Sequence, residues 1–407
     1  MRRTIIIAII VLVLLGAGVA AYFYFFPGAP SENVTSPGGN GLPIAGSAPG
    51  QGTSLPGGNG GVTPPITTPS GSPVSVSARL VKISAGPVVH GSVVSNIKPV
   101  NASSSPEVAV TYIERRSGNI FSYRVGAAVV TRISNKTLPG IQTASWLQDG
   151  SLAFVRYLSG TDFSTVNTYA LSSNGSDGSF LPQNLAGIAI ASTSVLTLAS
   201  GVNGSVASLE RVGGTSKSTV FTSPLSALRV SFAGKNQYLA FTKPSLSLPG
   251  SAFLVDSTGR FSRIAGPRSG LVALASPMGK WVLTSFMLDD AMYMELVNTG
   301  THETVPLPVA TIADKCVWAS DDSAIYCGVP LNPPTNQRYP DDWYQGAVSF
   351  NDRIWKIQVA GRYAQLVLEC PTEETASLDA QALAIDPAST VLVFMNKNDA
   401  SLWSYKL

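Results

Sequence analysis

The chain has 407 residues, of which 13% are charged, and its formal net charge is +3. Residues 78–407 contain 25 Lys or Arg and 23 Asp or Glu without any basic run, which excludes nucleic acid as an expected partner. This part of the chain is long enough for one large hydrophobic core. Its low charge and abundant Ser, Thr, Val, Gly and Pro are typical of an extracytoplasmic β protein.

The N-terminal 26 residues predict a single-pass membrane anchor. Thr4–Phe26 is an uncharged, mainly apolar run of 23 residues, and as a helix it would extend about 34 Å, enough for a hydrocarbon core of roughly 30 Å. Arg2 and Arg3 precede the run, so the N-terminus is expected in the cytoplasm and the rest of the chain outside the cell membrane. The alternative is a cleaved signal peptide, with Val19 and Ala21 as the small residues before the cut.

Residues 27–77 have the composition of a linker. They include 10 Pro and 12 Gly, no aromatic residue and one charged residue, Glu32. The segment 37–41, Pro-Gly-Gly-Asn-Gly, recurs at 56–60. Such a chain cannot bury enough apolar surface to offset its ordering entropy, so we expect it to be disordered.

An internal repeat organises residues 78–407. Short apolar segments bounded by turn residues predict seven buried strands, at Glu107–Glu114, Ser151–Leu158, Ser194–Gly201, Gln237–Pro244, Lys280–Met287, Ser323–Pro330 and Thr390–Lys397. Successive strands start 44, 43, 43, 43, 43 and 67 residues apart. The last interval is one repeat with an insertion, which we place at about residues 330–352.

Each repeat shows signs of four strands. A tight polar turn such as Asp149-Gly150 precedes several of the buried strands and predicts a hairpin. Third and fourth strands are expected beyond them, for example at Asn119–Val125 and Arg132–Ser134. Helical periodicity is missing apart from one short turn expected at Thr375–Leu383. Four strands per 43 residues are typical of a β-propeller.

The repeat length favours seven blades, with six as the alternative. The last repeat ends at Leu407 with only three strands. Arg79–Pro87 is similar to the fourth-strand segment Arg260–Pro267, so we expect it to pair with Ser401–Lys406 and to close the ring. The predicted fold is thus an all-β, seven-bladed propeller that follows a transmembrane helix and a disordered linker.

The turns resemble those of TolB-like and WD-repeat propellers, whose blades carry a Trp-Ser-Pro-Asp-Gly-type hairpin. Trp146 with Asp149-Gly150 keeps one part of this motif, and Ser276-Pro277 keeps another. The resemblance extends over nearly the whole repeat region. It implies the propeller fold and the binding of a protein or ligand. Together with the arginine pair before the anchor, it indicates a bacterial envelope protein.

The sequence carries no recognisable catalytic or metal-binding motif. His90 and His302 are its only histidines and have no metal-ligand spacing, so we expect no metal and no cofactor. Acid pairs that could serve a glycoside hydrolase occur at 289–290, 321–322 and 341–342, but adjacent acids in turns more commonly form or cap the turn. We expect no catalysis; the alternative is a carbohydrate- or envelope-active enzyme that uses carboxylates on the loop face.

The three cysteines include one pair placed for a disulfide. Cys316 and Cys327 are symmetric about the Asp321-Asp322 turn, so on a two-residue hairpin they would be directly opposite and close enough for a bond. The alternative is two small buried residues in the reduced form. Cys370 falls on a different strand and is expected to be free.

The insertion is the strongest candidate for a functional site. In a propeller this connection opens on the same face as the links between blades, which is commonly the binding face. Its aromatic and charged residues are candidates for contact with a protein or glycan partner, namely Arg338, Tyr339, Asp341, Asp342, Trp343 and Tyr344. Alternatively, Trp343 and Tyr344 pack the loop onto the ring. The sequence thus predicts a non-catalytic binding or scaffolding module at the cell envelope, or a subunit of a membrane-associated assembly.

Overall fold

The structure, a computed structural model, describes residues 79–97, 107–136, 138–176, 178–214, 216–369 and 377–407. The predicted anchor and linker lie outside the described residues, and so does Cys370. No helix among the described residues is long and apolar enough to cross a membrane. The described part of the chain is almost entirely β, with one 3₁₀ turn, η1 (Ala313–Lys315), and one short helix, α2 (Asp341–Gln345).

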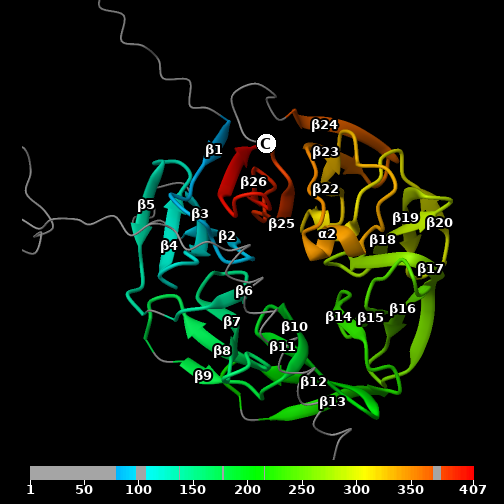
Figure 1. The fold of residues 1–407 in the computed structure, drawn as a ribbon, viewed down its shortest axis with the longest axis horizontal. Helices are drawn as coiled ribbons and strands as arrows, with labels where there is room; N and C mark the ends of the chain where they lie inside the picture. Colours follow the sequence, from blue (N-terminus) through cyan, green and yellow to red (C-terminus); the bar gives the residue numbers. More distant parts are fainter. Residues whose placement is uncertain (1–78, 98–106, 137, 177, 215, 370–376) are drawn as a thin grey trace, which may run out of the picture. The chain divides into compact units, whose positions relative to one another are not determined.

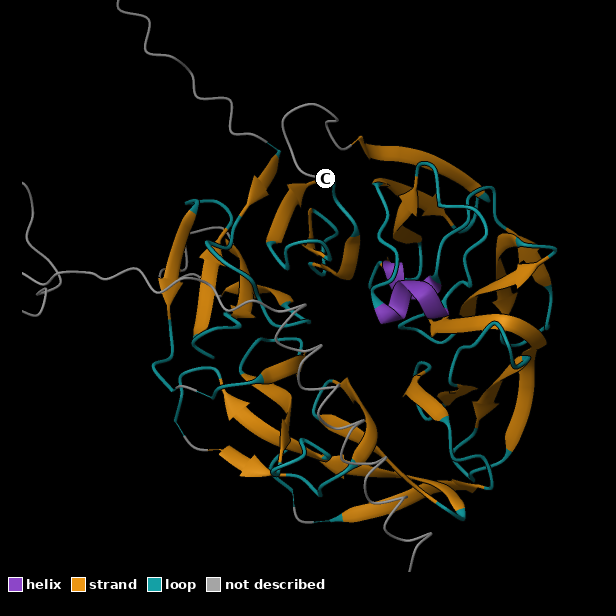
Figure 2. Ribbon diagram, in the orientation of Figure 1, coloured by secondary structure: helices purple, strands orange, loops and turns teal. Residues whose placement is uncertain are grey.

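The strands form antiparallel sheets that follow one another along the chain (Figures 1 and 2). The first sheet holds β2 (Val93–Ile97), β3 (Glu107–Ile113), β4 (Ile120–Arg124) and β5 (Val129–Arg132). The second holds β6 (Ile141–Trp146), β7 (Leu152–Ser159), β8 (Thr165–Ser172) and β9 (Gly178–Phe180). The third holds β10 (Leu185–Ala191), β11 (Ser194–Gly201), β12 (Gly204–Arg211) and β13 (Lys217–Ser223).

The fourth sheet has seven strands: β14 (Leu228–Phe232), β15 (Tyr238–Thr242), β16 (Gly250–Val255), β17 (Phe261–Ala275), β18 (Trp281–Leu288), β19 (Ala291–Asn298) and β20 (Thr304–Pro306). The fifth holds β21 (Cys316–Trp318), β22 (Ala324–Pro330), β23 (Asp352–Gln358) and β24 (Tyr363–Glu369). The last holds β25 (Ala380–Ile385), β26 (Val391–Asn396), β27 (Leu402–Lys406) and β1 (Leu80–Lys82).

The sheets are arranged radially around a common axis, as in a β-propeller (Figure 1). The first strands of neighbouring sheets contact each other near the axis, as β6 and β10, β10 and β14, and β21 and β25 do. β25 of the last sheet contacts β2 of the first, which completes the ring. The all-β propeller fold is therefore confirmed.

The seven predicted buried strands are confirmed to within two residues at either end. They are β3, β7, β11, β15, β18, β22 and β26, the second strand of each four-strand unit. All six residues of β26 are buried, because the neighbouring sheets cover both of its faces. Such a strand is a continuous apolar run rather than an alternating one, which is why the repeat was visible in the sequence.

The recurring tryptophan and aspartate turns join neighbouring sheets. The Trp146 indole donates a hydrogen bond to the carbonyl of Gly91 at 3.3 Å, and the Trp318 indole donates one to Leu274 at 3.4 Å. Asp322 is buried in the turn after β21 and accepts a hydrogen bond from the Ser276 hydroxyl of the preceding turn at 2.6 Å. The motif residues thus hold the ring together.

The predicted closure of the ring is confirmed. β1 pairs with β27 in antiparallel register, with Leu80 opposite Tyr405 and Lys82 opposite Trp403. The earliest described residues and the last ones therefore belong to the same sheet.

The prediction of a helical turn at Thr375–Leu383 is wrong for the described residues of this segment, because residues 380–383 belong to strand β25. Ala380 and the preceding Leu378 are both fully buried in the core of the last sheet. A register shift between Gln381 and Ala384 interrupts the pairing with β26. Burial against this sheet prevails over the helix propensity of an alanine- and leucine-rich segment.

Candidate functional site

Antiparallel topology places two kinds of connection at the same end of the sheets. The connection from the second to the third strand of each unit emerges there, and so does the link from the last strand to the first strand of the next unit. We call this end the loop face. The predicted insertion lies on it, since residues 331–351 separate β22 from β23.

The insertion bends toward the axis and is partly built into the core. Its helix α2 lies near the centre of the ring (Figures 1 and 2). Tyr339 and Trp343 are buried, and the Trp343 ring stacks against Phe350 with centroids 6.4 Å apart. These two aromatic side chains therefore pack the insertion onto the ring and are not open to a ligand.

A fully buried cluster of charges lies beneath the insertion. The Lys315 ammonium contacts a carboxylate oxygen of Asp352 at 2.7 Å and also contacts Asp379, and all three side chains are inaccessible to solvent. The Trp343 indole donates to the Asp379 carboxylate at 3.0 Å, and the Phe350 amide donates to it at 2.9 Å. This charge cluster, Lys315 with Asp352 and Asp379, ties the insertion to the first strands of two neighbouring sheets.

The Asp352 carboxyl titrates at an unusual pH. Burial raises its pKa from 3.8 to about 6, and the charge of Asp379 adds to this effect while that of Lys315 opposes it. One carboxylate oxygen, Oδ2, accepts a hydrogen bond from the Ala380 amide at 2.7 Å. The other, Oδ1, is buried without a hydrogen-bond partner among the described residues, which disfavours the ionised form.

The stability of the protein should therefore depend on the protonation of Asp352. The folded state binds this proton more tightly than the unfolded state, so the stabilisation is complete below pH 4 and is lost as the pH rises through about 6. Relative to Asp352→Asn, the wild type should lose roughly 2–3 kcal/mol of unfolding free energy between pH 4 and pH 7. Urea unfolding of both proteins at the two pH values measures this. If the unfolding free energies of the wild type and Asp352→Asn change in parallel with pH, the raised pKa of Asp352 is contradicted.

A second polar group, the axial cluster, lies at the axial end of the loop face. Arg229, on β14, donates to both carboxylate oxygens of Asp314 at 2.7 and 3.0 Å. The Tyr344 hydroxyl of α2 donates to Asp314 at 2.6 Å. His90, in the link before β2, interacts electrostatically with Asp314 and Arg229 although these residues come from other sheets. The axial cluster thus consists of His90, Arg229, Asp314 and Tyr344.

The groups of the axial cluster are solvent-accessible and yet surrounded by protein. The Arg229 side chain is 40% exposed, as is Tyr344. Desolvation nevertheless lowers the pKa of His90 and, together with Asp314, raises that of Tyr344 well above its ordinary value. His90 is therefore a neutral imidazole at pH 7. Both terminal nitrogens of Arg229 already donate hydrogen bonds, to Asp314 and Tyr344.

The remaining candidates of the insertion have structural contacts of their own. Asp341 accepts a hydrogen bond from the Leu246 amide at 2.6 Å, and Asp342 accepts one from the Arg338 amide at 2.7 Å. The Arg338 guanidinium donates to the Ser247 hydroxyl. A binding role for the six predicted residues stays a prediction, with Arg338 and Tyr344 as the exposed members.

Exposed apolar side chains gather on the loop face. Four connections between second and third strands each carry one, namely Phe163, Val202, Leu248 and Leu331, and Leu288 is the last residue of β18 at the same end. Val202 is fully exposed, and Leu248 and Phe163 are 71% and 67% exposed. At the opposite end, the described residues of comparable exposure are Met278 in a connection and Val129 and Tyr363 at strand starts, which are 68%, 50% and 53% exposed. We call these five side chains the apolar tips.

The remaining histidine and acidic candidates of the sequence lie in turns. The described residues include no group of three or more His, Cys, Asp or Glu that could hold a metal ion. His302 lies in an exposed turn with a positive φ of 60°. Asp321 accepts a hydrogen bond from the Ser323 amide at 3.0 Å. Asp289 and Asp290 form the tight turn between β18 and β19, also with positive φ.

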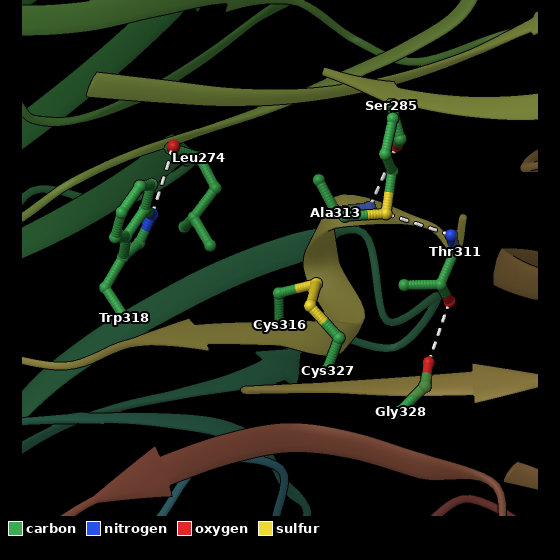
Figure 3. The surroundings of a disulfide bond; sticks show 9 residues. Leu274, Ser285, Thr311, Ala313, Cys316, Trp318, Cys327 and Gly328 are labelled. Carbon is green, nitrogen blue, oxygen red and sulfur yellow. Dashed lines mark hydrogen bonds between the residues drawn. A yellow bond between two sulfur atoms is a disulfide. The ribbon is translucent and has the colours of Figure 1, made fainter. Parts of the chain in front are cut away.

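Cys316 and Cys327 form a disulfide (Figure 3). They are direct partners in the register of β21 and β22, with Cα atoms 4.1 Å apart. Cys316 directly follows Lys315, so the bond fixes the strand that begins at the charge cluster.

The thiol count of the protein tests this bond. We expect one thiol per chain, that of Cys370, to react with iodoacetamide under denaturing conditions before reduction, and three to react afterwards. Intact mass spectrometry of the alkylated protein distinguishes these states. Three alkylated cysteines without reduction would contradict the disulfide.

Sequence reasoning missed the charge cluster and three members of the axial cluster. Lys315 and Asp379 are 64 residues apart, and no sequence feature of either segment indicates that the two residues are in contact. One available signal was the pair Asp314-Lys315, because two charges directly before a buried strand are unusual.

Known protein structures share this fold without sharing the sequence. No protein-family model and no curated protein matches the chain. The oligogalacturonate lyase of Vibrio parahaemolyticus is similar with a TM-score of 0.54 and 8% identity, over 82% of this chain and 94% of that one. A streptogramin B lyase is similar with a TM-score of 0.50 and 12% identity, over 80% of this chain and 96% of that one.

TolB of Acinetobacter baumannii is also among the similar structures, with a TM-score of 0.42 and 10% identity over 78% of this chain and 80% of that one. The predicted resemblance to propeller families such as the TolB-like one is supported at the level of the fold by the two lyase structures. At such low identity, none of these structures transfers an activity to this chain.

Proposed function

We propose that residues 79–407 form a seven-bladed β-propeller that serves as a non-catalytic protein-binding module outside the cell membrane, with Thr4–Phe26 as its anchor. The apolar tips carry this proposal. Exposed apolar side chains occur singly on most surfaces, but here five lie at one end of successive four-strand units, four of them in loops and Leu288 at the end of β18. Removal of these apolar side chains from water is favourable, so association with a protein partner that buries them is favoured.

The number of blades rests on β17. Its first half pairs with β16 and its second half with β18, with a register shift between Ser269 and Val272. The seven-stranded sheet can therefore be divided into two four-stranded blades that share β17, and the other five sheets have four strands each. This division supports seven blades rather than six.

The location rests on the sequence of the N-terminal segment. The apolar run Thr4–Phe26 after Arg2 and Arg3 supports an anchor with its N-terminus in the cytoplasm. Protease treatment of intact cells or spheroplasts should degrade the propeller, and carbonate extraction should leave the full chain in the membrane. A chain that is protected from the protease or is extracted by carbonate would contradict this location.

The binding function is tested by capture of a partner with matched variants of the full chain. After cross-linking in detergent-solubilised membranes, Val202→Ser with Leu248→Ser should reduce the captured partner at least about fivefold, because both tips lose their apolar contact area. Met278→Ser is the matched control, since Met278 is 68% exposed on the opposite face. Equal capture by the wild type and both variants would contradict a role for the loop face.

A further inference from the structure

The loop face contains a charged hollow where β17 passes from one four-strand unit to the next. The hollow has a volume of about 620 Å³ and includes Pro249, Arg268, Phe286, Leu288 and Glu295 in its lining. This volume lies within the usual range for ligand sites. Arg268 is directly opposite Gly250 in the register of β16 and β17, at the loop-face end of both strands.

The Arg268 side chain has neighbours that hold it in place, but its N–H donors make no hydrogen bond within the described part of the protein. Its guanidinium lies 4.0 Å from the centroid of the Phe286 ring, and its nearest acidic partner is Glu295, at 3.8 Å. That distance is too long for a hydrogen bond. The Arg268 side chain is 40% exposed and donates no hydrogen bond to any described residue. Arg229 of the axial cluster, by contrast, donates hydrogen bonds from both terminal nitrogens.

The chemistry of this hollow selects a carboxylate. A planar guanidinium with free N–H donors binds a carboxylate through two parallel hydrogen bonds. Stacking on Phe286 fixes the plane of the guanidinium, so little side-chain entropy is lost when the ligand binds. Asp289 and Asp290 follow Leu288 in the next turn. These two residues and Glu295, which lines the hollow, carry the same charge as a carboxylate ligand, so they disfavour a run of acidic residues more strongly than a single one.

The rim of the hollow favours a protein ligand over a glycan. Leu288 is 50% exposed, and Leu248, which precedes Pro249, is 71% exposed. These aliphatic side chains suit an apolar neighbour of the carboxylate. A sugar ring would favour an aromatic face, but the only aromatic ring of the hollow, Phe286, is buried and lies beneath Arg268.

We propose that this hollow binds one Glu or Asp side chain, flanked by apolar residues, of the protein that covers the loop face. The proposal rests on the proposed function and specifies its chemistry. Arg268 supplies the specificity for the carboxylate, and Leu248 and Leu288 supply the apolar contacts.

A pair of peptides tests the proposal on the detergent-solubilised full chain. The probes are fluorescein-labelled Gly-Leu-Glu-Leu-Gly-amide and the same peptide with Gln in place of Glu, measured by fluorescence anisotropy. The Glu peptide should bind about tenfold or more tightly than the Gln peptide, as a charge-assisted hydrogen bond predicts. Arg268→Gln should abolish this difference. Arg263→Gln should keep it, because Arg263 is an exposed residue of the same strand.

Three results would overturn the proposal: equal binding of the two peptides, no binding of either, or an unchanged preference in Arg268→Gln. Direct binding of D-galacturonic acid, measured by isothermal titration calorimetry, together with no binding of either peptide would assign the hollow to a glycan instead. The capture experiment with Val202→Ser and Leu248→Ser does not use these peptides. Partner capture that depends on the apolar tips, without a peptide preference, would therefore refute only this inference.

Discussion

Replacement of Lys315 by Met should lower the free energy of unfolding by about 3–5 kcal/mol at pH 7. Lys315 is fully buried between Asp352 and Asp379, and its ammonium lies 5.0 Å from the Trp343 and Phe350 ring centroids. Met has a similar length and fills the same space, so the loss arises from charge rather than from a cavity. Two buried carboxylates would face each other without the cation that separates them.

A second substitution separates the charge effect from a packing effect. In the Lys315→Met background, Asp352→Asn removes one of the two carboxylates and should recover a large part of the lost stability. Urea unfolding of the wild type, both single variants and the double variant gives the coupling energy. If Lys315→Met changes stability by less than about 1 kcal/mol, or if Asp352→Asn destabilises the variant further, the charge cluster does not have the role described here.

The architecture was predictable because the sequence repeats the physical cause of each strand. A second strand that is covered on both faces, such as β18 or β26, needs a run of apolar residues, and that run recurs every 43 or 44 residues apart from the last interval of 67. The hairpin turns before these strands need residues that tolerate a positive φ, as Gly150 and Gly279 do. Both signals are local, so one sequence suffices to read them.

The site was less predictable because ring closure assembles it. The axial cluster takes His90 from the link before β2, Arg229 from β14 and Asp314 from η1, and no short segment contains two of them. Trp343 was a binding candidate on its chemistry alone, and only the position of Asp379 shows that its indole is used internally. The sequence pattern located the loop face, whereas the contacts decide which of its residues are available.

Deletion of residues 79–86 should open the ring, whereas deletion of residues 28–77 should leave the stability of the propeller unchanged. The first deletion removes β1 together with Ile83, which is buried against the first and last sheets. Loss of a buried Ile side chain alone costs about 2–5 kcal/mol. It also removes the pairing of β1 with β27 and further hydrogen bonds, among them those from the Ile83 amide to Leu402 at 2.8 Å and from the Leu402 amide to the Ser84 hydroxyl at 2.9 Å.

The summed loss exceeds about 4 kcal/mol, a large share of the 5–15 kcal/mol that stabilises a typical domain. The deletion has a second consequence. Without β1, β27 becomes an edge strand with unpaired N–H and C=O groups, and such edges associate with other chains. We therefore expect Δ79–86 to unfold at lower urea concentration and to elute as oligomers in size-exclusion chromatography. Ile83→Asp should reproduce the loss of stability with a single substitution, since it buries a charge among apolar side chains.

The linker deletion is the matched control, because it removes a longer segment from the same end of the chain. If Δ28–77 and Δ79–86 unfold at the same urea concentration and elute alike, the last sheet does not need its N-terminal strand. If only Δ79–86 fails, the residues that follow the linker are part of the propeller itself. The linker would then attach at the outer strand of the last sheet, since β1 pairs with β27 and not with β25.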